Sequence, residues 1–224
     1  VNGVGSSIAR EAYRVFYTFA GPEIAVATTK AYSAQLVAVY AFAVRLAEAR
    51  GETDAARTAA LTAELSALPD KMTRVLEDKE RIQWFTAKFA AAHDVFFIGR
   101  GIDYATCMEG SLKMKEISYI HSEAYAAGEL KHGTISLVED GTLVIGVVTQ
   151  SALYEKTLSN MVEVRSRGAY LVGLTNYGSY TMEDNADFTI YIPKTDEHFS
   201  TSLAVIPLQL MGYYISVARG LDVD

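Results

Sequence analysis

The chain has 224 residues, of which 50% are apolar and 21% are charged, and its formal net charge is −7. This composition is typical of a globular protein with a sizeable core, and it excludes the broadly basic class of nucleic-acid-binding proteins. The single cysteine, Cys107, excludes an intramolecular disulfide framework and a multi-cysteine zinc site. We therefore expect neither a metal nor a cofactor, no nucleic-acid partner, and a reducing, cytoplasmic setting.

The sequence predicts no association with a membrane. The apolar stretch Leu36–Val44 is far shorter than the roughly 20 residues that a membrane-spanning helix needs. The first residues also lack a basic region followed by an apolar one, so they do not resemble a signal peptide.

The predicted elements alternate between strands and helices over most of the chain. In chain order they are a strand at Val15–Phe19, helices at Glu23–Ala49, Thr53–Leu68, Pro69–Leu76 and Glu80–Ala92, a strand at Asp94–Gly99, a helix at Tyr104–Ile117, a strand at Thr142–Thr149, a helix at Tyr154–Arg167, strands at Ala169–Thr175 and Phe188–Ile192, and a helix at Ser200–Arg219. This alternation favours a parallel α/β sheet, in which ligands bind beyond the carboxyl ends of the strands.

The chain also resembles itself at a spacing of about 174 residues, which indicates an internal duplication. Residues 2–45 match residues 176–219 in the order and spacing of their elements. In the second copy a strand and a helix starting near Asp94 precede the matching half, and no such front half precedes Val1. We therefore expect about 80 to 100 further residues before Val1. The domains predicted are 1–52, the C-terminal half of a first subdomain, 53–80, connecting helices, and 81–224, a complete second subdomain.

Three loops after strands could hold a ligand. In Val4–Ser7 a glycine permits close approach of the backbone, and two serines offer hydroxyls to a sugar or phosphate. The loop Gly99–Tyr104 has part of a dinucleotide-binding pattern, but its third glycine is replaced by tyrosine. The loop Thr149–Thr157 precedes a helix, where hydroxyl and N–H groups suit a phosphate. Capping of that helix by Ser151 is the simpler interpretation.

The segment from Glu109 to Gly133 carries the residues best suited to acid–base chemistry. Lys113 and Glu116 share a helix face, which by itself is also typical of a surface salt bridge. Residues 122–133 follow with little apolar periodicity, which predicts a loop, and glycines bracket Glu129 to His132 within it. A carboxylate and an imidazole could together move protons between carbon and oxygen.

Residues 113–133, Lys-Met-Lys-Glu-Ile-Ser-Tyr-Ile-His-Ser-Glu-Ala-Tyr-Ala-Ala-Gly-Glu-Leu-Lys-His-Gly, strongly resemble the isomerase part of the glucosamine-6-phosphate synthases, the glutamine:fructose-6-phosphate aminotransferases. Residues 5–8, 21–36, 207–210 and 219–224 are similar to the same family. The resemblance implies two tandem sugar-isomerase (SIS) subdomains. Each is a flavodoxin-like three-layer α/β sandwich with a parallel sheet, and here the first is incomplete.

The resemblance also implies a reaction and its residues. The family makes glucosamine 6-phosphate from fructose 6-phosphate and ammonia, which a separate glutaminase domain releases, and this step begins UDP-N-acetylglucosamine biosynthesis. Glu116 would move a proton between C1 and C2, and Lys113 would tune the charge around it. His132 would assist ring opening, reaching the site from the partner subunit of a homodimer. The backbone of Val4 would contact the sugar, and Ser6 is a second substrate-binding candidate.

Departures from the family pattern limit this expectation. The serine- and threonine-rich phosphate loops of the first subdomain, the C-terminal lysine and the glutaminase domain lie outside this sequence, and Cys107 does not match the glutaminase nucleophile. The second copy has lost most hydroxyls from its loops, so we expect it not to bind a sugar phosphate. We expect the 224-residue chain alone to be inactive. Two alternatives remain open: a relative that deglycates fructosamine phosphates, and an SIS-type regulatory module that senses sugar phosphates.

Overall fold

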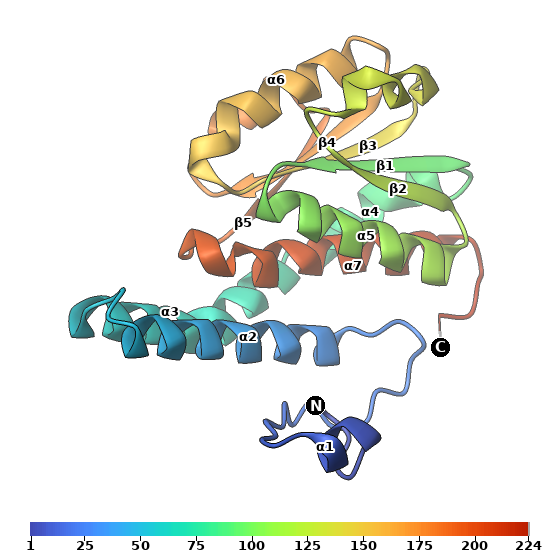
Figure 1. The fold of residues 1–224 in the computed structure, drawn as a ribbon. Coiled ribbons are helices and arrows are strands. Elements are labelled where there is room, and N and C mark those ends of the chain that lie inside the picture. Colours follow the sequence, from blue (N-terminus) through green and yellow to red (C-terminus); the bar gives the residue numbers. More distant parts are fainter. Residues whose placement is uncertain (224) are drawn as a thin grey trace. The chain divides into compact units, whose positions relative to one another are not determined.

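The computed structural model describes residues 1–223 (Figure 1). Its helices are α1 (Ser7–Glu11), α2 (Lys30–Ala49), α3 (Ala55–Leu76), α4 (Lys79–Thr86), α5 (Ile102–Ser118), α6 (Tyr154–Arg165) and α7 (Ser200–Ala218), and its strands are β1 (Asp94–Gly99), β2 (His121–Ala126), β3 (Leu143–Val148), β4 (Tyr170–Asn176) and β5 (Phe188–Ile192). Short 3₁₀ turns cover Ala87–Phe89, Leu130–His132, Thr134–Leu137, Ser151–Leu153, Tyr180–Met182 and Glu197–Phe199. The chain forms two compact units, Val1–Ser66 and Ala67–Val223, which divide within α3.

The second unit is built on one parallel sheet of five strands in the order β2-β1-β3-β4-β5. This is the strand order of flavodoxin-like folds, so the predicted parallel α/β class is confirmed. All six residues of β3 are buried, because this central strand has strands on both sides and helices on both faces.

Helices cover the two faces of this sheet in separate layers (Figure 1). One face packs against α5 and α7, and α4 packs in turn on α7. The other face packs against α6, whose Met161 and Val164 join Phe96, Val144 and other apolar residues in a buried cluster. The carboxyl ends of the strands therefore lie between two helical layers, where the loops that follow them converge.

The contact between α5 and α7 is close because α5 carries Gly110. A Cβ atom at this position would lie 2.7 Å from Cδ1 of Leu208 and 3.1 Å from a ring carbon of Phe97. Glycine therefore lets α7 approach the helix that carries Lys113 and Glu116.

Among the described residues, one segment, Glu197–Ala218, is long and apolar enough to span a membrane, yet 61% of its apolar window is buried inside the protein. Its apolar composition follows from its place in the core.

In the first unit, the predicted strand at Val15–Phe19 is wrong. Residues 15–19 form no strand, and Phe19 adopts φ +53°, a left-handed conformation that interrupts an extended chain. This segment makes two backbone hydrogen bonds to the N-terminal residue. Val1 N donates to the carbonyl of Phe16 at 2.8 Å, and Thr18 N donates to the carbonyl of Val1 at 3.0 Å. One such pairing does not make a strand, because a ladder needs successive bonds to a neighbour.

That single pairing nevertheless has the pattern of a parallel bridge between Val1 and Tyr17. In the second unit, Thr175 of β4 and Tyr191 of β5 are parallel partners, and each lies 174 positions after Val1 and Tyr17 respectively. The same backbone geometry at equivalent positions supports the predicted internal repeat.

Several helix boundaries differ from the prediction, and two of these differences have a clear physical basis. The predicted helix at Glu23–Ala49 begins at Lys30, and Oε2 of Glu23 instead accepts the N–H of Ala31 at 3.1 Å from outside the helix. Pro69 does not end a helix, since α3 continues through it to Leu76. Leu68 and Val75 are both buried on either side of the proline, and their packing offsets the hydrogen bond that Pro69 cannot donate.

The segment predicted as a loop after α5 contains strand β2, which pairs with β1 along its whole length. Apolar periodicity did not reveal it because β2 is an edge strand whose residues are mostly half-buried. Its buried Ser122 exchanges hydrogen bonds with Ser111 of α5, and the carbonyls of both residues take part. Side chains and backbone of α5 thus hold the edge strand in place.

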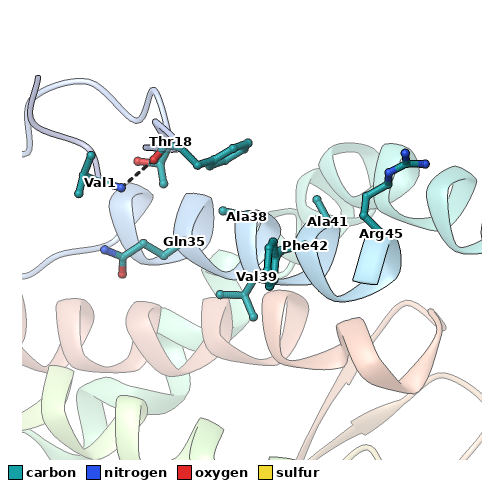
Figure 2. A pocket seen from close by; sticks show the side chains of 9 residues that line it. Val1, Thr18, Gln35, Ala38, Val39, Ala41, Phe42 and Arg45 are labelled. Carbon is teal, nitrogen blue, oxygen red and sulfur yellow. Dashed lines mark hydrogen bonds between the residues drawn. The ribbon is translucent and has the colours of Figure 1, made fainter. Parts of the chain in front are cut away.

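The first unit has an open apolar groove of about 680 Å³. Figure 2 shows that Val39 and Phe42 of α2 line it, with Val1 and Thr18 at one end and Arg45 at the other. Phe42 is 71% exposed and Val39 is 63% exposed, so other residues of the first unit leave this face of α2 uncovered.

Candidate active site

The candidate site is built on one face of α5. Glu109, Lys113 and Glu116 are spaced i, i+4 and i+7, so their side chains point to the same side of the helix. Lys113 Nζ lies 2.6 Å from Oε2 of Glu116 and 3.5 Å from Oε1 of Glu109. One ammonium group is therefore shared by two carboxylates.

Burial distinguishes this group from an ordinary surface salt bridge. The side chain of Lys113 is 4% exposed, whereas those of Glu109 and Glu116 are 13% and 30% exposed. A buried ammonium is costly unless it is paired, so the two carboxylates account for its presence in the core. Burial raises the pKa of the Glu109 carboxyl above its ordinary value, and the charge of Lys113 opposes that rise.

Two features fix the C-terminal end of α5, just after Glu116. Tyr119 adopts a left-handed conformation that ends the helix after Ser118. On the side of α7, Ser216 Oγ donates a hydrogen bond of 2.6 Å to the carbonyl of Ile117. The carboxylate of Glu116 is thus held on a rigid helix and remains partly open to solvent, as a group that exchanges protons with a substrate must be.

His132 lies apart from these ionic contacts. It closes the 3₁₀ turn Leu130–His132 that follows β2, and it is exposed. Among the hydrogen bonds and ion pairs of residues 1–223, none joins the imidazole of His132 to Lys113 or Glu116.

The two substrate-binding candidates lie in the first unit. Val4 is 84% exposed in the loop before α1. Ser6 is the N-cap of α1, and its hydroxyl accepts the N–H of Ala9 at 3.4 Å. A helix-capping role accounts for this contact of Ser6.

Sequence reasoning missed two acidic residues. Glu109 was not included in the ionic group, although its i, i+4 spacing to Lys113 is visible in the sequence. Asp103, at the start of α5, is 2% exposed and accepts hydrogen bonds from the loop after β3. Its only signal in the sequence is an acidic residue in the first turn of a helix, which is common at exposed positions.

The fold and site together define a class: a flavodoxin-like α/β domain with a candidate proton-transfer carboxylate on the helix that follows its first strand. A family model confirms and refines the fold part of this class, since the SIS domain model matches residues 1–45 and 88–219. The chain therefore belongs to the SIS domain family.

Curated relatives carry one name. The chain is 53% identical over 223 residues to the glutamine–fructose-6-phosphate aminotransferase [isomerizing] of Caldanaerobacter subterraneus subsp. tengcongensis, a match that covers 100% of this chain and 37% of that relative. It is 42% identical to the enzyme of the same name from Methanosarcina mazei, of which it spans 36%. The chain thus spans little more than a third of these relatives.

A solved structure agrees with these matches. The C-terminal domain of glucosamine-fructose-6-phosphate aminotransferase from Francisella tularensis superposes with a TM-score of 0.95 at 36% sequence identity. That match covers 100% of this chain and 63% of the other. The resemblance predicted from residues 113–133 is confirmed over the whole chain.

Proposed function

We propose that this chain is the sugar-isomerising part of a glutamine–fructose-6-phosphate aminotransferase, with fructose 6-phosphate as substrate and glucosamine 6-phosphate as product. The observation that carries the proposal is the buried Lys113, held 2.6 Å from the partly open carboxylate of Glu116. The shared name of the curated relatives supports the same substrate.

In the proposed reaction, ammonia condenses with the C2 carbonyl of the open-chain ketose and water leaves, which gives an imine. Glu116 then accepts a proton from C1 and returns it to C2. The C1 hydroxyl proton passes to the imine nitrogen, so the imine becomes the amine and the C1 oxygen becomes the aldehyde oxygen. A carboxylate suits this two-way transfer because it can act first as a base and then as an acid. Lys113 provides positive charge beside the reacting atoms and orients the carboxylate.

His132 would assist ring opening of the sugar. The exposed position of its turn supports the proposal that it acts on the site of a second chain in a homodimer. The backbone of Val4 and the hydroxyl of Ser6 would contact the sugar. The ammonia would come from a glutaminase domain outside this sequence, in a cytoplasmic enzyme that supplies UDP-N-acetylglucosamine biosynthesis.

A chimera tests the proposal in a complete enzyme. This chain replaces the matching 223-residue segment of the Caldanaerobacter relative, and glucosamine 6-phosphate is measured with fructose 6-phosphate and glutamine as substrates. We expect the chimera to be active and the Glu116→Gln chimera to lose about 10²- to 10⁴-fold in kcat. Glu139→Gln, which changes an exposed glutamate in the same way, is the matched control. Full turnover by Glu116→Gln would exclude the proposed role of Glu116, whereas a parent chimera that binds fructose 6-phosphate without turnover would favour a sugar-phosphate sensor.

Mixing two variants tests the shared site. In a mixed dimer of Glu116→Gln and His132→Ala chimeras, one site carries both changes and the other carries neither. Random reassociation should restore about a quarter of the parent activity, because half of the dimers are mixed and each has one intact site. Inactive mixtures that contain mixed dimers would show that both residues act within one chain.

A further inference from the structure

The crevice between β1 and β3 is where a flavodoxin-like sheet places its ligand. The chain leaves β1 for β2 on one side of the sheet and returns to β3 on the other side, so the loops after β1 and β3 part at this point. Ligands of open α/β sheets bind at such a switch point, beyond the carboxyl ends of the strands. In the second unit these loops are Arg100–Gly101 and the segment that starts at Thr149.

A carboxylate of the chain itself occupies this crevice. Oδ2 of Asp103 accepts the N–H of Thr149 at 2.8 Å and the N–H of Gln150 at 3.3 Å. Oδ1 of Asp103 accepts the hydroxyl of Thr149 at 2.5 Å. Asp103 is 2% exposed, so its negative charge lies inside the crevice, bound to the groups that would otherwise face a ligand.

A second carboxylate, that of Glu197, accepts a hydrogen bond from the next backbone N–H group of the same loop. The N–H of Ser151 donates to Oε1 of Glu197 at 2.9 Å. The helix cap predicted for Ser151 is wrong, since the N-cap of α6 is Leu153. Three successive backbone N–H groups, at residues 149 to 151, thus bind acidic side chains of this chain. Such a row of N–H groups is a common way to bind phosphate.

The loop after β3 has enough open space beside it for a phosphate. A cavity of about 430 Å³ opens beside the loop, lined by Thr149, Gln150, Ser151, Lys194 and Glu197 among others. A phosphate in this cavity could reach the row of N–H groups only by displacing Asp103 and Glu197, and it would be repelled by both charges.

We propose that Asp103 is an internal anion that occupies the phosphate position of the second SIS copy and, with Glu197, prevents phosphorylated ligands from binding there. Asp103 is therefore a specificity-determining residue that would restrict sugar phosphate to the other copy. This inference concerns binding alone and does not depend on the proposed reaction.

The test uses inorganic phosphate and the 224-residue chain. Binding is followed by NMR through the amide signals of Thr149, Gln150 and Ser151, so that phosphate bound elsewhere is not counted. We expect these amides to be unaffected in the wild-type chain. In Asp103→Ser they should shift in a saturable way, with an affinity about tenfold or more above wild type. Asp140→Ser, at an exposed aspartate before β3, removes the same charge and should behave as wild type.

Two results would overturn the proposal: saturable shifts of these amides in the wild-type chain, or a folded Asp103→Ser chain whose loop amides do not respond. If Asp103→Ser does not fold, Asp103→Asn takes its place, since it keeps the side-chain volume and removes the charge. We expect weaker phosphate binding at the same amides of that variant, and its absence would equally overturn the proposal.

Discussion

Replacing Lys113 with methionine tests whether the buried ammonium stabilises the second unit. The substitution keeps an unbranched side chain in the core but removes the charge shared by Glu109 and Glu116. The two carboxylates, 13% and 30% exposed, then lose their common partner. Loss of one member of a fully buried pair costs about 3–5 kcal/mol. Because both carboxylates reach solvent in part, we expect a smaller loss of about 2–3 kcal/mol.

Urea unfolding measures this loss in the second unit. Trp84, the single tryptophan, lies in α4 of that unit, so its fluorescence follows the same unit that contains Lys113. The matched control is Lys115→Met, an exposed lysine on the same helix, which we expect to change the unfolding free energy by less than about 0.5 kcal/mol. Equal losses in the two variants would refute the reasoning, because charge removal on α5 would then matter irrespective of burial and partners.

Two further predictions concern α5. Gly110→Ala places a Cβ 2.7 Å from Cδ1 of Leu208, so we expect a net loss of about 1–2 kcal/mol in the same urea assay, despite the better helix propensity of alanine; an increase in stability would contradict the tight α5–α7 contact. Burial raises the pKa of the Asp103 carboxyl above its ordinary value. The folded chain therefore holds this proton more tightly than the unfolded chain, and stability falls as pH rises from about 4 through the raised pKa. The asparagine of Asp103→Asn does not titrate, so the stability of this variant relative to wild type should increase over that pH range. A constant difference between pH 4 and 8 would contradict the raised pKa of Asp103.

Local sequence patterns were sufficient for most of the second unit. Strand β5 has the predicted bounds, and β1 does as well, because short apolar runs bounded by turns have few alternatives. Lys113 and Glu116 were predicted to share a helix face from spacing alone, and they do. The edge strand β2 could not be found in this way, since its pairing with β1 depends on the backbone and its side chains are only partly buried.

Sequence by itself determined the parallel α/β class and the family, and it placed Lys113 and Glu116 on one helix face, because these depend on periodicity and on a long specific motif. Only the tertiary structure decided how deeply each charge is buried. It placed Lys113 in the core between two carboxylates, and it brought Asp103 against Thr149, 46 residues away. The physical reason is that burial and desolvation depend on which elements pack together, whereas spacing along a helix gives only the face on which a side chain lies.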